Sequence, residues 1–386
     1  MPPLNVQLLQ SGAEYFPALI DAINRAGREV RLETYIFSDD PTGQRVAEAL
    51  AGAARRGVSV HLVVDGFGTG PLPAPIARTL SDAGVQVQVY APMPRSIWPS
   101  RDRLRRLHRK LACIDGQTAF IGGINVLDDH WDPNHGELEH PRLDYAVQVG
   151  GSIAQTVQAE MQLLWAHLAN RPLQRTVNAG LDQARALALR FRRRREGAYL
   201  ALRDNLAHRR EIERAYLQAI GQARNEVLIA NAYFFPGRRF RRALREASRR
   251  GVKVQLLLQG RVEYILPHRA AQALYESLMA SGIEVFEYHR SFLHAKVAVI
   301  DDWATVGSSN IDPFSLLLAR EANLVIRDAG FAAELRDRIV HAIHEGGLPI
   351  AADEPRHRPL YQRAWGWLAY GLLRLGVLVS GERQRF

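Results

Sequence analysis

The chain contains an internal repeat, and this repeat constrains the fold more than any other feature of the sequence. Arg55–Val64 has the sequence RRGVSVHLVV, and Arg249–Leu258 has the sequence RRGVKVQLLL. Three more matched pairs follow the same order along the chain: Ala22–Val30 with Ala219–Val227, Gly84–Tyr90 with Gly282–Tyr288, and His108–Asn125 with His294–Asn310. Four matched pairs in one order indicate that a single structural unit has been duplicated.

Each copy alternates amphipathic helical segments with short apolar strands. This alternation is typical of an α/β fold in which helices cover a largely parallel sheet. The last two strands of each copy are only a few residues apart, which favours a hairpin and therefore a mixed sheet. The expected strands are Glu29–Tyr35, Val58–Asp65, Leu111–Ile114 and Thr118–Gly122, with counterparts at Glu226–Ala232, Val252–Gln259, Val297–Ile300 and Thr305–Gly307. We predict two α/β/α sandwich repeats related by a pseudo-two-fold axis.

The length of 386 residues fits two domains, each with enough chain to bury a core. We place the first repeat at residues 1–170 and the second at residues 199–350. The intervening residues 171–198 are helix-prone and basic, and we expect a linker or an ordered crossover there. The polar stretch Asp353–Pro359 contains two prolines and sets apart a C-terminal tail, residues 351–386.

The composition excludes several classes of protein. Hydrophobic residues make up 47% and charged residues 23% of the chain, which is ordinary for a globular protein and argues against disorder. The single cysteine, Cys113, excludes an intramolecular disulfide and a cysteine metal cluster, and its apolar neighbours predict a buried thiol. Residues 1–10 lack the basic and apolar pattern of a signal peptide, so we expect the bulk of the chain to stay in the cytoplasm.

The charge balance points to a polyanionic partner. Lys+Arg number 50 against 40 Asp+Glu, which gives a formal charge of +10. Nucleic acid and an anionic membrane surface both fit this excess. The sequence shows no helix-turn-helix, zinc-finger or RNA-binding aromatic pattern, so the membrane surface is the partner we expect.

The C-terminal tail favours the same partner. Ala364–Ser380 is apolar apart from Arg374 and has Trp365, Trp367 and Tyr370 at its leading edge. Seventeen residues are short for a bilayer core of roughly 30 Å, and aromatic side chains of this kind favour the headgroup level. We expect a short membrane-associated helix, with a helix packed on the domain or a true span as alternatives. The predicted location is peripheral, on the cytoplasmic face of the inner membrane.

Each copy carries the same group of polar residues in its last matched segment. Only three of the 50 basic residues are lysines, and two of these, Lys110 and Lys296, lie two residues after a histidine. An aspartate follows each lysine by five positions, and a Gly-x-x-Asn sequence comes next. A single His-x-Lys is weak evidence, whereas two copies with the same continuation are a strong signal. The predicted catalytic residues are His108, Lys110, Asp115, His294, Lys296 and Asp301, and the predicted phosphate-binding residues are Asn125, Asn310 and Ser308.

The spacing of these residues suits chemistry on a phosphodiester. Residues two apart on a strand share a face, so each histidine and its lysine point to the same side. A pseudo-two-fold axis would bring both pairs to one cleft, where ammonium and amide groups could hold the charge of a phosphoryl transition state. One imidazole could attack phosphorus while the other protonates the leaving oxygen. Lysines can neutralise this charge without a cation, so we expect no metal and no cofactor.

Two carboxylates are candidates for orienting the histidines. Glu321 precedes the apolar strand Ala322–Ile326, and Asp144 precedes the corresponding strand Tyr145–Val149. A carboxylate on the ring nitrogen fixes the tautomer of a histidine and stabilises its charged form. Asp115 and Asp301 begin turns after strands, so they could tie down loops instead of contacting substrate. The competing interpretation of the whole set is a duplicated structural domain with buried histidines.

These residues resemble the phospholipase D superfamily, whose signature is H-x-K-x4-D followed by G-[GS]-x-N. Both copies match, although the first has Gly123 where the second has Ser308. Other segments resemble bacterial cardiolipin synthases, most closely their B-type branch: Glu33–Asp40 (ETYIFSDD), Phe120–Asn125 (FIGGIN), Ala230–Gly237 (ANAYFFPG) and Ala304–Pro313 (ATVGSSNIDP).

The resemblance implies a transferase. A phosphatidyl group would move from phosphatidylglycerol onto His108, and the hydroxyl of a second phosphatidylglycerol would then accept it, giving cardiolipin and glycerol. His294 would act first as the acid and then as the base, although pseudo-symmetry allows the opposite roles. The alternative within the superfamily is a phosphodiesterase that hydrolyses phospholipid or nucleic acid. A non-catalytic membrane adaptor is a third class, but it would tolerate the loss of a histidine and neither is missing.

Overall fold

The computed structural model describes most of both repeats. The described residues are 5–92, 106–132, 134–169, 197–204, 208, 210–262, 265–312, 319–351 and 371. The predicted linker lies outside them apart from residues 197 and 198, and the predicted membrane helix lies outside them apart from Gly371. Among the helices in these ranges, none combines the length and the apolar character needed to cross a bilayer.

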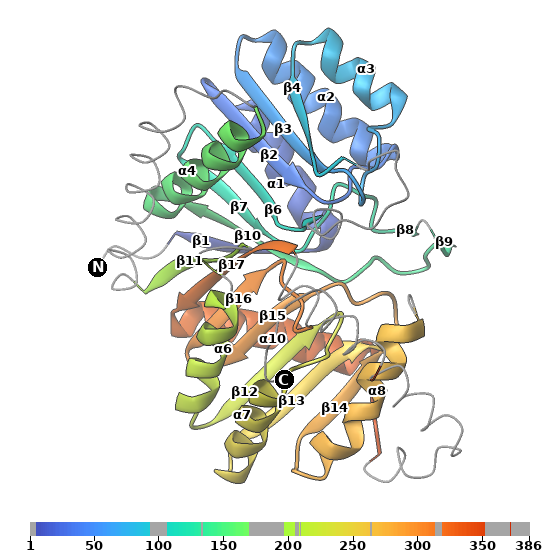
Figure 1. Ribbon diagram of the computed structural model, residues 1–386, viewed down its shortest axis with the longest axis vertical. Helices are drawn as coiled ribbons and strands as arrows, with labels where there is room; N and C mark the ends of the chain where they lie inside the picture. Colours follow the sequence, from blue (N-terminus) through green and yellow to red (C-terminus); the bar gives the residue numbers. More distant parts are fainter. Residues whose placement is uncertain are drawn as a thin grey trace.

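The first repeat forms a seven-stranded mixed sheet (Figure 1). The strands β2, β3 and β4 run parallel to one another, and every other neighbouring pair is antiparallel. The order across the sheet is β1 (Val6–Gln10), β10 (Tyr145–Gly150), β7 (Thr118–Gly122), β6 (Lys110–Ile114), β2 (Glu29–Thr34), β3 (Ser59–Asp65) and β4 (Gln86–Tyr90).

The second repeat has a sheet of the same topology. Its order is β11 (Ala198–Arg203), β17 (Ala319–Arg327), β16 (Trp303–Gly307), β15 (Lys296–Ile300), β12 (Glu226–Asn231), β13 (Lys253–Gln259), β14 (Glu284–Tyr288) and β18 (Gly347–Pro349). Strand for strand, this order matches the first sheet, with β18 added at one edge. The duplicated mixed α/β architecture predicted from the sequence is confirmed, and the predicted strands agree with the observed ones to within a few residues.

Three helices cover the outer face of each sheet (Figure 1). They are α1 (Ser11–Asn24), α2 (Pro41–Arg55) and α3 (Ala74–Asp82) in the first repeat, and α6 (Glu211–Gln222), α7 (Arg238–Arg249) and α8 (Ile265–Met279) in the second. Each set buries its apolar stripe in a separate core with its own sheet. Local sequence sets the limits of α2: Asp40 caps its first turn by accepting from the Gly43 N–H at 2.8 Å, and Gly57, with φ of 88°, ends the segment.

The inner faces of the two sheets share a third core. It contains buried residues of β7 and β10 from the first repeat and of β16 and β17 from the second, together with residues of α4 (Gly151–Leu168) and α10 (Ala329–Gly346). The inner face of each sheet is therefore covered by one helix, α4 or α10, and by the sheet of the other repeat. Cys113 is buried in this core, as predicted, and its thiol donates to the Ala154 carbonyl at 3.5 Å. Because the core is continuous, the residues at its rim are held in fixed positions relative to each other.

Candidate active site

The segment that carries each histidine is hydrogen-bonded to the other repeat. The His108 and Arg109 N–H groups donate to the Arg320 carbonyl at 3.0 and 2.8 Å, next to the pairing of β5 (Arg106–Leu107) with β17. In the opposite direction, the His294 N–H donates to the Leu143 carbonyl at 2.8 Å. These exchanged bonds bring the two motifs together at the boundary between the sheets.

Each acceptor residue is followed by the carboxylate that holds the histidine. The Nδ1 atom of His108 lies 2.9 and 3.2 Å from the two carboxylate oxygens of Glu321. The Nδ1 atom of His294 lies 2.6 Å from Oδ2 of Asp144. The sequence identified both carboxylates but not their pairing, and the structure pairs each with the histidine of the other repeat. With Nδ1 occupied in this way, Nε2 of each ring is the atom available for chemistry.

The two lysines complete the charged cluster. The Lys110 ammonium donates to the His108 carbonyl at 2.7 Å, and the Lys296 ammonium donates to the His294 carbonyl. The two residues are only 3% and 0% exposed. Burial, reinforced by the charge of Lys296, lowers the pKa of Lys110 to about 7. An anion entering between the repeats would therefore be stabilised strongly, because burial shields these ammonium charges from water.

Burial also changes the ionisation of the histidine–carboxylate pairs. It raises the pKa of Asp144 to about 7 and holds the pKa of His294 well below its usual value, where the two lysines lower it further. The pKa of His108 is also lowered, mainly by burial, although Glu321 opposes this shift. Both imidazoles are therefore neutral at rest, with Nε2 able to accept a bond or a proton.

The two carboxylates have different neighbours. The Ser308 hydroxyl donates to Oε2 of Glu321 at 2.5 Å, so it contacts a carboxylate and not the open cleft where a phosphate contact was expected. Gly123 occupies the matching position in the first repeat, and a Cβ atom there would lie 2.4 Å from Oδ1 of Asp144. The shorter aspartate brings its carboxylate close to the backbone, which leaves no room for a serine.

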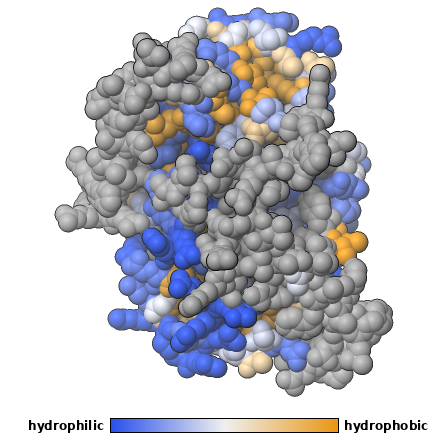
Figure 2. All heavy atoms as spheres, viewed as in Figure 1, coloured by the Kyte–Doolittle hydropathy of each residue, from blue (hydrophilic) through white to orange (hydrophobic). Residues whose placement is uncertain are grey.

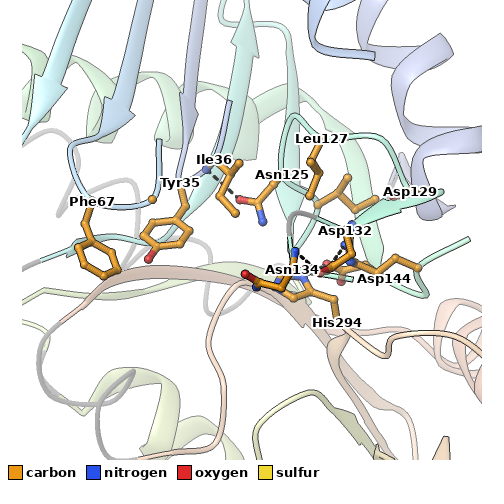
Figure 3. Close-up of a pocket in the computed structure, with 13 residues that line it drawn as sticks. Tyr35, Ile36, Phe67, Asn125, Leu127, Asp129, Asp132, Asn134, Asp144 and His294 are labelled. Atoms are coloured by element: carbon orange, nitrogen blue, oxygen red, sulfur yellow. Dashed lines mark hydrogen bonds and ion pairs between the residues drawn. The ribbon is translucent and has the colours of Figure 1, made fainter. Parts of the chain in front are cut away.

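The two asparagines lie at the rim of the cluster. Oδ1 of Asn125 accepts from the Ile36 N–H at 3.2 Å, which leaves the amide nitrogen of Asn125 directed into the pocket in Figure 3. Asn310 is buried at the matching place after β16. This orientation makes the Asn125 side chain a hydrogen-bond donor toward whatever the pocket contains.

Asp115 and Asp301 lie outside the cluster. The Asp115 carboxylate accepts from the N–H groups of Gly27, Arg28 and Glu29 at 2.8–2.9 Å. Asp301 makes the same three contacts with residues 224–226 at 2.8–3.0 Å. Both aspartates have positive φ, 55° and 51°, in the turn at the far end of β6 or β15. These contacts join the start of β2 or β12 to the end of the neighbouring strand β6 or β15, and they fit the alternative that both aspartates tie down loops.

Two further residues, not predicted from the sequence, position the histidines. Oδ2 of Asp65 accepts from the Leu107 N–H at 2.7 Å, and Oε1 of Gln259 accepts from the Leu293 N–H at 2.8 Å. Both acceptors are buried at the ends of matching strands, β3 and β13. Their equivalent places in the repeat, directly after an apolar strand, were a signal that could have identified them.

Tyr35 contributes an aromatic contact to the histidine–lysine pair of the first repeat. The Tyr35 ring meets His108 edge-on with 4.9 Å between ring centroids, and the Lys110 ammonium lies 5.3 Å from the same ring. Ala232 follows β12 at the position that Tyr35 occupies after β2. The residue directly after β2 or β12 therefore differs between the two repeats although the backbone topology is repeated.

A pocket of about 220 Å³ opens beside His294 (Figure 3). Most of its lining comes from the first repeat: Tyr35, Ile36, Phe67, Gly68, Ile124, Asn125, Leu127, Asp129, Asp132, Asn134, Arg142 and Asp144. Within the described ranges, no three His, Cys, Asp or Glu side chains are grouped so that they could hold a metal ion.

Comparison with known proteins gives the family of the chain. The model of the cardiolipin synthase, phospholipase D-like domain matches residues 19–165 and 216–342, one segment in each repeat. Cardiolipin synthase B of Escherichia coli (strain K12) is 42% identical over 383 residues, covering 97% of this chain and 87% of that protein. Cardiolipin synthase A of Pseudomonas fluorescens is 31% identical over 353 residues, covering 91% and 71%.

A solved structure supports the fold. The crystal structure of phosphatidylserine synthase from Haemophilus influenzae superimposes with a TM-score of 0.67 at 15% identity, covering 97% of this chain and 94% of that one. Both segments of the family match contain the histidine, lysine and asparagine positions described above. The chain belongs to the phospholipase D-like cardiolipin synthase family.

Proposed function

We propose that this protein is a cardiolipin synthase, a phosphatidyltransferase that uses phosphatidylglycerol as both donor and acceptor and releases glycerol. The observation that carries the proposal is the meeting of two histidine–carboxylate pairs and two buried lysines at one boundary. The similarity to cardiolipin synthase B over 97% of the chain supports the choice of substrate.

The donor phosphate would bind between the repeats. Lys110 and Lys296 would neutralise its charge, and the amide groups of Asn125 and Asn310 would donate hydrogen bonds to its oxygens. These groups are positioned before the substrate arrives, so they can stabilise the added charge of a five-coordinate transition state with little reorganisation. This charge neutralisation needs no cofactor.

In the first step, His108 would attack phosphorus through Nε2. A bond forms between phosphorus and this nitrogen, and the bond from phosphorus to the glycerol oxygen breaks. His294, carrying a proton in the bound complex, gives that proton to the departing oxygen. Glu321 holds the proton on Nδ1 of His108 and stabilises the positive charge that develops on the ring.

In the second step, a hydroxyl of another phosphatidylglycerol would replace the departed glycerol. His294 takes the proton of this hydroxyl, the new phosphorus–oxygen bond forms, and the bond to His108 breaks. The assignment of roles rests on the difference between the two pairs. Glu321 presents both oxygens to His108 and is fixed by Ser308, whereas burial brings the pKa of Asp144, the partner of His294, to about 7, which suits proton transfer near neutral pH.

The partner surface would be an anionic membrane, with the protein peripheral on the cytoplasmic face of the inner membrane. Figure 2 shows hydrophilic side chains gathered over α6 and α7 of the second repeat. The helix α7 has the sequence RRFRRALREASR, and its arginines at 238, 239, 242 and 249 are exposed. Such a row of arginines is attracted to acidic lipid headgroups.

Product analysis tests the proposal. Purified protein is incubated with vesicles that contain labelled phosphatidylglycerol, and the expected products are labelled cardiolipin and free glycerol in equal amounts. A preparation that releases only phosphatidic acid would establish a hydrolase and overturn the synthase assignment. Cleavage of a nucleic acid phosphodiester without lipid turnover would establish the second alternative. The His108→Ala variant is the blank, because it lacks the proposed nucleophile.

A further inference from the structure

The first repeat has a longer connection before its catalytic carboxylate. Asn125 and Asp144 are 19 positions apart, against 11 for Asn310 and Glu321. The additional chain carries a short hairpin, β8 (Trp131–Asp132) with β9 (Gly136–Glu137), and it forms one wall of the pocket beside His294. This wall has no sequence counterpart of the same length in the second repeat.

Contacts within the connection hold this wall in place. Nη2 of Arg142 donates to Oδ2 of Asp132 at 2.9 Å, and Oδ1 of Asp132 accepts from the Asn134 N–H at 2.9 Å. Asp129 accepts from the Gly12 N–H, which joins the connection to the start of α1. The pocket is therefore a built feature of the first repeat, and its polar groups face a defined space.

The charges of the pocket differ from those of the phosphate site. Among the described residues, its walls carry the carboxylates of Asp129, Asp132 and Asp144 and the guanidinium of Arg142, which is paired with Asp132. A second phosphate would be repelled by this set, whereas neutral hydroxyl groups can donate to the carboxylates. The same walls expose carbon surface from Ile36, Leu127 and Tyr35, as expected for a ligand with an apolar backbone and polar substituents.

The size of the pocket also limits its ligand. A volume of about 220 Å³ corresponds to roughly seven water molecules at about 30 Å³ each. A three-carbon polyol is of comparable size, whereas a diacyl chain is far larger. Because His294 lines the pocket, a hydroxyl bound there lies beside the group proposed to donate and accept the proton.

We infer that this pocket is the alcohol subsite of the enzyme: it binds the glycerol headgroup that leaves in the first step and then the glycerol headgroup of the acceptor lipid in the second. The inference rests on the proposed function and adds the part of the chain that selects the acceptor. Asp129 and Asn134 hydrogen-bond the hydroxyls that do not react. The reacting hydroxyl gives its proton to His294 as its oxygen bonds to phosphorus, and the bond from phosphorus to His108 breaks.

Competition between small alcohols tests the subsite. Protein is incubated with phosphatidylglycerol vesicles in the presence of labelled glycerol and labelled 1-propanol at equal concentration, and the two labelled lipid products are compared. We expect the wild-type protein to favour glycerol at least about tenfold, since the bound polyol makes two hydrogen bonds that propanol lacks. Equal incorporation of the two alcohols by wild-type protein would overturn the inference without affecting the transferase assignment.

Two variants locate the selectivity in the pocket. Asp129→Asn keeps an oxygen for the Gly12 N–H but removes the charge, and Asn134→Leu removes the polar side chain from an exposed position. Each should lower the glycerol-to-propanol ratio about fivefold to tenfold, whatever the absolute rates. Glu137→Gln, on the same hairpin but outside the pocket lining, is the matched control and should keep the wild-type ratio.

The possible results distinguish failure of the alcohol subsite from failure of the proposed synthase activity. Wild-type ratios in both folded variants would overturn the alcohol subsite while leaving the synthase intact. Absence of any labelled lipid, with phosphatidic acid as the product, would overturn the proposed function and the subsite with it. If either variant fails to fold, the preference of the wild-type protein for glycerol over propanol still decides the question.

Discussion

The two repeats place a histidine, a lysine and an asparagine at matching positions, but they differ in how each carboxylate is held. In the second repeat, the longer Glu321 is fixed by the Ser308 hydroxyl. In the first, the shorter Asp144 lies against Gly123, and burial raises its pKa to about 7. A duplicated scaffold can therefore supply two histidines with different tasks, because the side chain beside each one sets its ionisation.

Removing each histidine in turn is the strongest test of whether the two histidines have different tasks. His108→Ala and His294→Ala should each lower transfer by about 10³–10⁴-fold, because one removes the nucleophile and the other the proton donor. The two variants should differ in what they accumulate. His294→Ala can retain slow attack by His108 on a donor with a good leaving group, so a phosphatidyl-protein should be trapped by rapid quenching and mass spectrometry.

The reverse pattern would reverse the roles. Trapping the covalent species in His108→Ala and never in His294→Ala would make His294 the nucleophile. The matched control is His341→Ala, which removes an exposed histidine of α10 far along the sequence from either motif. It should leave transfer and trapping unchanged.

Replacing Lys110 separates activity from stability. The Lys110→Met variant should lose about 10²–10³-fold in transfer, because half of the charge at the phosphate site is gone. Burial lowers the pKa of Lys110 from its unfolded value, about 10.4, to about 7. Its contribution to stability is therefore complete above pH 10 and is lost as the pH falls toward 7, since the unfolded chain takes up the proton first.

Thermal unfolding checks the sign of this effect. The difference in Tm, variant minus wild type, should be more positive at pH 7 than at pH 10, by roughly 2–5 °C. A difference that is independent of pH would mean that the Lys110 ammonium is as favourable in the folded protein as in water. The exposed Lys253, at the start of β13, gives the matched control Lys253→Met, for which no such trend is expected.

Exchanging the residue beside each carboxylate, Gly123 or Ser308, tests whether the two carboxylates are held differently. Gly123→Ser places a Cβ atom 2.4 Å from Oδ1 of Asp144, so the carboxylate that contacts His294 must shift. We expect about 10–100-fold slower transfer and a loss of about 1–3 kcal/mol in the free energy of unfolding. Ser308→Gly removes the donor to Glu321 and the acceptor of the Ala322 N–H without a steric clash, and it should cost about tenfold in transfer. A larger loss in Ser308→Gly than in Gly123→Ser would contradict the steric argument.

The duplication of the fold was predictable because repeated local patterns give repeated local structure. The positions of the central strands, the histidines and the lysines followed from matched segments, and the carboxylates Glu321 and Asp144 followed from their equivalent places before apolar strands. The pairing of Glu321 with His108 and of Asp144 with His294 did not, because it depends on how the two sheets pack against each other. The hydrophobic pattern within one repeat does not show how that repeat packs on the other.

Other features of the site escaped prediction for related reasons. Asp65 and Gln259 act through backbone N–H groups of distant residues, and a single sequence does not show which N–H a side chain will meet. Asp115 and Asp301 belong to the family motif, and their contacts with the N–H groups that precede β2 and β12 fit the alternative, already open from the sequence, that they tie down loops. A motif therefore groups residues that act in chemistry with residues that hold the fold.

The smallest effect is expected on membrane binding, where the exposed surfaces of the matching helices α2 and α7 are compared. Six of the twelve residues of α7 are arginines, whereas α2 has Arg45 and Arg55 along its fifteen residues. Arg239→Gln, on the exposed side of α7, should weaken binding to vesicles rich in phosphatidylglycerol about fivefold, since one basic residue near an anionic surface is worth about 1 kcal/mol. Arg45→Gln on α2 should change binding by less than about twofold.

Sedimentation with vesicles at low and high salt checks both values, because the Arg239 effect should disappear as salt screens the surface. Equal losses from the two variants would mean that the net charge, and not the second repeat, directs the protein to the membrane.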